Sequence, residues 1–191
     1  MKHHVIYVFG LGDHRARGQE LAVRLWRIYG VQSEVFHMQW RDGKPFAPKL
    51  EKLLQKIDDY HEQGDKVSLV AASAGASVAV AAFAARPAVM SRVVLVCGKI
   101  LNPQNMHPSV FRKNVSFKDS LGAIDANLAK LSAEDRRRIM TIHPVADESV
   151  PVRDTFIEGA VERTVPVVGH ALGIGYSITV YAPIMMRFLK Q

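Results

Sequence analysis

Three side chains of this sequence have the types and the chain order that acyl transfer by a serine requires. Ser73 stands at the centre of an A-x-S-x-G pentapeptide, Asp147 begins "DESVP", and His170 directly follows a glycine. A serine hydroxyl is a weak nucleophile until an imidazole takes its proton, and a carboxylate must orient that imidazole. The three residues therefore predict a triad of nucleophile, base and orienting acid.

Small residues around Ser73 indicate where in a fold this serine would stand. A nucleophile on a sharp strand-to-helix turn needs small neighbours two residues away on either side, because strand and helix pass close together there. Ala71 and Gly75 occupy those two places, alanine being a mild departure from the commoner glycine. On the pentapeptide alone, an N-cap serine in a tightly packed crossover is the alternative to a nucleophile. The choice between them depends on whether a suitable histidine and acid are present.

The other acids and histidines have weaker claims to the same roles. Asp147 stands closer to the end of its strand than Glu148 or Asp154, and we expect Glu148 to contact only solvent or a helix start. His143 lies within or at the end of a strand, which leaves His170 without a close rival. No pair of histidines has metal-site spacing, so we predict no metal and no cofactor. Cys97 is expected to be a small buried core residue.

The elements that must position these residues alternate between strand and helix. Such alternation predicts a doubly wound, mostly parallel sheet with helices on both faces. Apolar runs as long as "VVLV" fit strands buried on both sides. The six expected strands cover residues 4–10, 32–38, 66–71, 91–98, 138–144 and 162–170.

Periodic apolar residues place three of the helices. Leu21, Leu25 and Ile28 recur at helical spacing before Gly30 and predict a core-facing helix. A second helix is expected over residues 47–64, and the last over residues 178–189.

A connection of about forty residues, 98–138, is longer than a simple crossover needs. We expect it to be a small lid or pocket wall, with a helix over residues 120–131 and a capping box joining Ser132 and Asp135. Its apolar residues are either pocket lining or ordinary helix packing; the pocket candidates are Met106, Phe111 and Phe117.

In these motifs the chain resembles the α/β-hydrolase family, and among its members the small serine hydrolases without a large cap domain. The shared features are "VFGLG" after the first strand, "ASAG" around Ser73, "DESVP", and "GH" near the end. The resemblance covers nearly the whole chain. It implies a six-stranded sheet in the order 2-1-3-4-5-6, with both glycine-containing turns above the crevice where the winding reverses.

The resemblance also implies an oxyanion hole. Its donors would be the backbone N–H groups of Leu11 and Ala74, with Gly10 and Gly12 allowing the first loop to approach closely. A plain glycine turn between strand and helix is the alternative for this loop.

Composition limits the remaining classes. With 191 residues, 48% hydrophobic and 23% charged, the chain predicts one globular domain over residues 1–191. Its +7 charge is spread along the sequence, which makes nucleic acid an unexpected partner. The one dense cluster, Arg136–Arg138, fits a solvated helix face, with a phosphate-binding patch as the alternative.

Cellular location follows from weaker signals. A single cysteine fits a reducing compartment, and the five apolar residues Val5–Phe9 are too few for a signal-peptide core. Three serines and Gly75 interrupt the apolar stretch 66–87, so we expect no membrane span and a cytoplasmic protein.

The predicted function is a serine hydrolase that cleaves a small-molecule acyl ester or thioester. A binding or scaffolding protein with the same fold, little turnover and a protein partner is the alternative.

Overall fold

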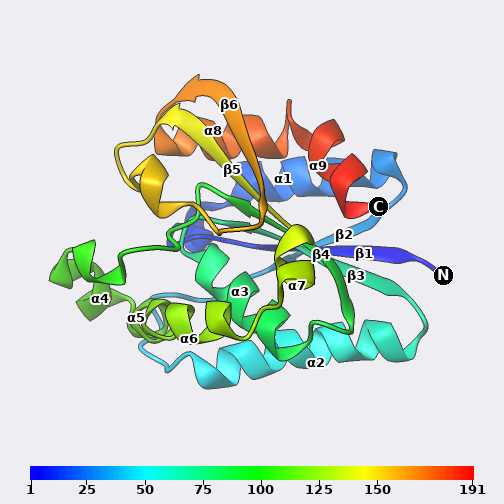
Figure 1. Ribbon diagram of the computed structural model, residues 1–191, viewed down its shortest axis with the longest axis horizontal. Helices are drawn as coiled ribbons and strands as arrows, with labels where there is room; N and C mark the ends of the chain where they lie inside the picture. Colours follow the sequence, from blue (N-terminus) through cyan, green and yellow to red (C-terminus); the bar gives the residue numbers. More distant parts are fainter.

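A computed structural model describes the backbone of residues 1–191 and every side chain apart from that of Arg15. Six parallel strands form one sheet in the order β2-β1-β3-β4-β5-β6 (Figure 1). This confirms the predicted fold class and strand order. The strands are β1 (His3–Val8), β2 (Gln32–Phe36), β3 (Lys66–Ala72), β4 (Met90–Val96), β5 (Ile139–Ala146) and β6 (Val161–Val168).

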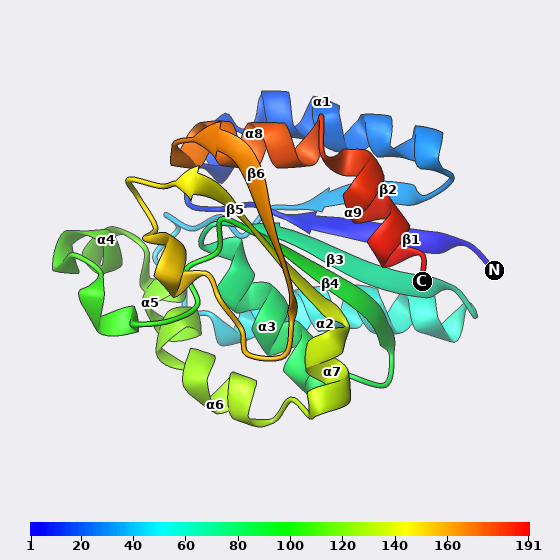
Figure 2. The ribbon, with the colours of Figure 1, turned by 45° about the horizontal axis from the view of Figure 1, so that its top comes forward.

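Helices cover both faces of this sheet. One face carries α1, α8 and α9, and the other carries α2, α3, α5 and α6 (Figure 2). The helices are α1 (Arg17–Leu25), α2 (Ala47–Glu62), α3 (Gly75–Ala85), α4 (Pro108–Lys113), α5 (Val115–Gly122), α6 (Ile124–Ala129), α7 (Ala133–Arg137), α8 (His170–Ile178) and α9 (Ala182–Leu189).

The central strands are apolar on both faces, as a doubly covered sheet requires. In β3, Leu69 and Ala71 pack under α2 and α3, whereas Val70 and Ala72 pack on the opposite side. Helix α3 is buried along almost its whole length, which explains why its sequence is apolar all round rather than on one stripe.

The predicted core face of α1 is wrong. Leu21, Leu25 and Ile28 are 61%, 57% and 74% exposed, and the buried residues are instead Val23 and Trp26 together with Ala22. The Trp26 indole N–H donates to the carbonyl of Ile178 on α8, at 2.9 Å, which fixes this orientation. The α-helix also ends at Leu25 and tightens into a 3-10 turn, so a single helical period does not run through to Ile28.

Two predicted helices have different bounds in the structure. The segment expected over 120–131 consists of α5 and α6, which meet at Ala123. The last helix, expected over residues 178–189, begins later in the structure, at Ala182, as α9. Helix α8, which was not predicted, precedes it and ends at Ile178, and the two helices meet at an angle of 62°. Pro183 stands in the first turn of α9, where its missing N–H costs no helical hydrogen bond. The expected capping box of Ser132 and Asp135 is present.

Among the described residues, no single helix has the length and apolar character to cross a membrane. Only the bent pair α8 and α9 reaches that length and composition when the two are taken together.

Candidate active site

Ser73 lies in the turn between β3 and α3, with a backbone φ of 52°. This left-handed conformation is uncommon for a residue with a side chain and is the strained geometry that the pentapeptide predicts. Gly75 is required by the packing beneath it. A Cβ there would lie 2.6 Å from the carbonyl oxygen of Val8 and 2.9 Å from that of Phe9. The start of α3 therefore rests directly on the carboxyl end of β1.

The loop after β1 approaches Ser73 just as closely. A Cβ on Gly10 would lie 2.9 Å from the Cβ of Ser73, so only glycine fits without a shift. Gly12, by contrast, has open space around the position of a Cβ. Leu11 and Ala74 both line the same pocket as Ser73, and neither backbone N–H group has an acceptor among the described contacts.

His170 bridges Ser73 and Asp147. It is the first residue of α8, and Gly169 before it has a φ of 103°, which favours glycine strongly. The His170 Nε2 atom lies 2.9 Å from Ser73 Oγ, and its Nδ1 atom lies 2.7 Å from Asp147 Oδ2. A carboxylate can only accept, so Nδ1 carries the proton and Nε2 is free to accept from the serine hydroxyl.

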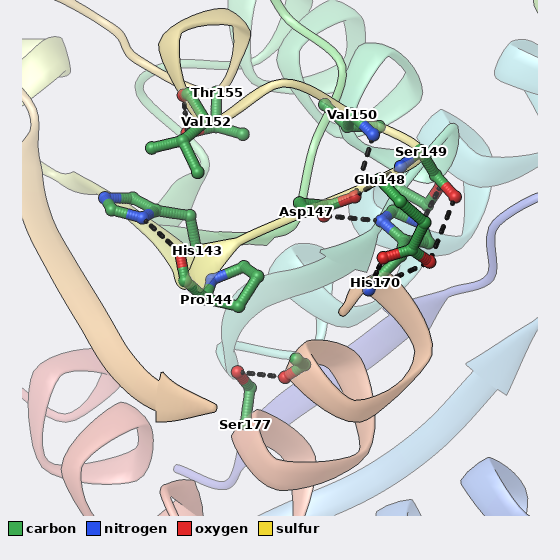
Figure 3. Close-up of polar contacts among 12 residues, drawn as sticks. His143, Pro144, Asp147, Glu148, Ser149, Val150, Val152, Thr155, His170 and Ser177 are labelled. Carbon is green, nitrogen blue, oxygen red and sulfur yellow. Dashed lines mark hydrogen bonds and ion pairs between the residues drawn. The ribbon is translucent and has the colours of Figure 1, made fainter. Parts of the chain in front are cut away.

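The Asp147 carboxylate is held at both oxygens. Its Oδ1 atom accepts the backbone N–H groups of Ser149 and Val150, each at 2.8 Å, while Oδ2 faces the imidazole (Figure 3). The side chain has no solvent exposure. The turn that follows β5 thus orients the Asp147 carboxylate toward the ring of His170.

Glu148 has a contact that the sequence did not reveal. Its Oε2 atom accepts the backbone N–H of His170 at 3.0 Å, at the amino end of α8 (Figure 3). Backbone hydrogen bonds, that from His170 among them, lower the pKa of this carboxyl below its ordinary value. The expectation that Glu148 contacts only solvent or the start of the following helix is wrong, because the helix start that it contacts is that of α8, 22 residues further along the chain.

A pocket of about 630 Å³ opens above these residues and is lined by Ser73 and His170. Gly10, Gly12, Met106 and Phe117 line it as well. Phe111 does not, because its ring packs against that of Phe117 at a centroid distance of 5.9 Å. The segment 98–138 supplies one side of this pocket through six residues: Lys99, Asn105, Met106, His107, Val110 and Phe117. That this segment moves as a lid stays a prediction.

A buried ion pair supports that side of the pocket. Lys99 Nζ lies 2.5 Å from Asp154 Oδ2, and both side chains are almost fully buried. The second carboxylate oxygen accepts from Asn102 at 2.6 Å. Burial alone would raise the pKa of Asp154, but the hydrogen bonds from Lys99 and Asn102 hold it below its ordinary value. No sequence pattern connects these residues, which lie 55 positions apart.

Cys97 is buried, as predicted, and lies beside Asp147 and His170. Its sulfur and the nearest atoms of Asp147 and His170 are within 4.8 Å of one another, the one arrangement among the described residues with metal-like spacing. Burial and the neighbouring charges of Asp147 and Glu148 raise the pKa of Cys97 to about 12. A thiol held protonated is a poor metal ligand. The absence of a metal stays a prediction.

Solved structures of known proteins share this architecture. The ydeN gene product from B. subtilis superposes with a TM-score of 0.71 at 16% identity, over all of both chains. MGS-MChE2, described as an alpha/beta hydrolase enzyme from a lagoon-sediment metagenome, gives 0.69 at 13% identity, over 100% of this chain and 91% of its own. The protein has the α/β-hydrolase fold.

The same fold recurs in a lipase. Paleococcus ferrophilus monoacylglycerol lipase superposes at a TM-score of 0.59 with 16% identity, over 97% of this chain and 93% of its own. No family model and no curated protein matches the sequence. At these identities the likeness extends to the α/β-hydrolase fold alone.

Proposed function

We propose that the protein is a serine hydrolase that cleaves a carboxylic ester or thioester through an acyl-enzyme. The observation that carries this proposal is the continuous chain of contacts from Ser73 Oγ through the His170 ring to the buried Asp147 carboxylate. The fold is shared with enzymes described as lipases and esterases, which supports hydrolysis as the general class of reaction.

In the acylation step, His170 Nε2 takes the hydroxyl proton while Ser73 Oγ attacks the substrate carbonyl carbon. The imidazolium that forms is stabilised by Asp147, which stays ionised. His170 then gives the proton to the leaving alcohol or thiol. Water repeats the sequence on the acyl-enzyme, releasing the carboxylic acid and restoring Ser73.

The tetrahedral intermediate carries its negative charge on the former carbonyl oxygen. The free N–H groups of Leu11 and Ala74 are the donors that would face this oxygen. Each such donor contributes about 3–4 kcal/mol to the transition state in related chemistry. The amino end of α3, which begins at Gly75, adds a favourable dipole.

The pocket favours a small substrate with an apolar part. Its volume falls within the range of about 300–1,000 Å³ that is usual for small-ligand sites. Phe9, Leu11, Met106, Val110 and Phe117 supply apolar surface beside the serine. An acyl or alcohol group of modest size fits this lining.

A fluorophosphonate probe tests the proposal directly. We expect stoichiometric labelling of the native protein at Ser73, and loss of both labelling and ester turnover in Ser73→Ala with an unchanged circular dichroism spectrum. A panel of short- and long-chain acyl esters and thioesters then defines the substrate. Folded protein that is neither labelled nor active on any member would favour the alternative of a binding protein with this fold.

A further inference from the structure

A second pocket lies at the opposite end of the sheet from Ser73 and is lined by four arginines. Its volume is about 300 Å³, and the arginines are Arg92, Arg137, Arg163 and Arg187. Arg92 stands at the amino end of β4, whereas Ser73 follows the carboxyl end of β3; parallel strands place these ends on opposite sides of the molecule. In Figure 1 the C-terminal end of α9 marks this side.

Strand parity directs two of these arginines toward the same place. On the face covered by α9, β4 presents Val94 and Val96, and Arg92 continues that row. On the same face β6 presents Val161 and Val165, with Arg163 between them. Both strands therefore place an arginine where an apolar core residue would continue the pattern. Arg163 is exposed on this edge strand, and Arg92 is half-buried with its guanidinium against the ring of Phe188, so both charged groups reach the surface of the pocket.

The other two arginines of the pocket come from helices. Arg187 lies on α9, one residue before Phe188, whose ring is 4.7 Å from the Arg92 guanidinium carbon. Arg137 ends α7. Burial and the nearby charge of Arg138 lower the pKa of Arg92, consistent with a positive local field.

No anion within the described chain neutralises these groups. The described ion pairs include Arg86 with Asp58 and Arg138 with Asp135, but none of the four arginines of this pocket. The pocket lining contains no aspartate or glutamate, and Gln191 also borders it. Like charges gathered in one concavity repel each other and raise the local concentration of anions.

We propose that this arginine pocket binds a compact polyphosphate anion. Guanidinium groups match phosphate oxygens in two-point hydrogen bonds, and four positive charges favour an anion of higher charge than a single phosphate. The small concave shape favours a short chain of phosphates over an extended nucleic-acid backbone, which would need a continuous basic groove. The site is independent of the proposed hydrolase reaction, because it is at the other end of the sheet.

Calorimetric titration of the full chain with sodium tripolyphosphate, pyrophosphate and inorganic phosphate at constant ionic strength tests this. We expect saturable one-to-one binding that strengthens in the order phosphate, pyrophosphate, tripolyphosphate. Arg163→Gln/Arg187→Gln should weaken tripolyphosphate binding about tenfold or more. The control Arg24→Gln/Arg112→Gln removes the same charge from exposed positions on α1 and α4 and should change binding by less than about twofold.

Several results would overturn the proposal. These are the absence of saturable binding, equal losses in the arginine-pocket and control variants, and tripolyphosphate binding no tighter than phosphate. Circular dichroism verifies each fold, and if the double variant is unfolded, the single Arg187→Gln on the exposed side of α9 takes its place. A parallel titration with ATP distinguishes the two possible sources of the phosphate chain. Tighter binding of ATP than of tripolyphosphate indicates a nucleotide ligand, and weaker or equal binding of ATP indicates a free polyphosphate.

Discussion

The backbone N–H of His170 donates to the carboxylate of Glu148, while the ring of the same histidine faces Asp147. Two adjacent acids therefore hold one residue at two points. Glu148 fixes where the helix that carries the imidazole begins, and Asp147 fixes how the imidazole is turned. Their side chains leave the backbone in different directions, which lets neighbours have separate roles.

This division predicts unequal losses when each charge is removed. Asp147→Asn should lower turnover by roughly 10³–10⁴ near neutral pH, because the amide removes the charge that stabilises the imidazolium and favours the wrong tautomer. Glu148→Gln keeps an oxygen that can accept the N–H of His170, and turnover should fall by less than about tenfold. Steady-state rates on one activated ester measure both. Equal losses would contradict the assignment, and a larger loss at Glu148 would transfer the orienting role to it.

A pair of glycines tests the close packing beneath the serine. Gly75→Ala places a methyl group against two backbone carbonyls of β1 and should lower the free energy of unfolding by about 1–3 kcal/mol. Gly12→Ala meets open space at a negative φ and should change it by less than about 0.5 kcal/mol. Urea unfolding compares the two. Similar free energies of unfolding for both variants would show that the turn accommodates a methyl group at residue 75 despite the close contacts with β1.

The ion pair of Lys99 and Asp154 makes a different prediction about stability. Lys99→Met leaves a carboxylate buried without its cation and should cost about 3–5 kcal/mol. In Lys99→Met/Asp154→Asn the charge is gone from both partners, and the loss should shrink to about 1–2 kcal/mol. Chemical denaturation of both variants supplies the comparison. If Lys99→Met/Asp154→Asn were no more stable than Lys99→Met, the loss in the single variant would not come from the unpaired charge of Asp154.

His3 predicts a loss of stability in mild acid. Burial, followed by the charges of Lys66 and Lys190, lowers the pKa of His3 to about 4, against 6.5 for an unperturbed histidine. Between these two values the unfolded chain binds a proton that the folded protein does not, so stability falls as pH decreases from about 6.5 to about 4. His3→Gln should remove about 1–2 kcal/mol of this decline, allowing for solvent screening. His61→Gln, at an exposed position, should leave the pH dependence of urea unfolding unchanged; identical curves for all three proteins would contradict the assignment.

Strand-level features were predictable from the sequence because they depend on short-range patterns. Apolar runs fixed the strands, and the residues at their carboxyl ends identified Ser73, Asp147 and His170 as neighbours. The role of Phe111 was not predictable in the same way. Consecutive residues on a short helix point in different directions, and only the packing of α4 on α5 places Val110 in the pocket and Phe111 behind it.

Contacts between loops that are distant in the sequence could not be predicted from sequence patterns. Lys99 and Asp154 meet only because β4 and β5 are adjacent, and neither residue stands in a recognisable motif.

The buried face of α1 was ambiguous from the sequence for a related reason. Both Leu21 with Leu25 and Ala22 with Trp26 have helical spacing, and the contact of Trp26 with α8 selects between them.

The strand that leads to His170 is the most solvated of the sheet. β6 is an edge strand with mostly exposed side chains, whereas β3, which leads to Ser73, is central and buried. Local opening is easiest where few apolar contacts must break. Fraying of β6 would carry His170, the proposed base, away from Ser73, and the serine hydroxyl would then lack the group proposed to take its proton. On heating, His170 would therefore separate from Ser73 before the hydrophobic core unfolds, and activity would be lost at a lower temperature than the fold.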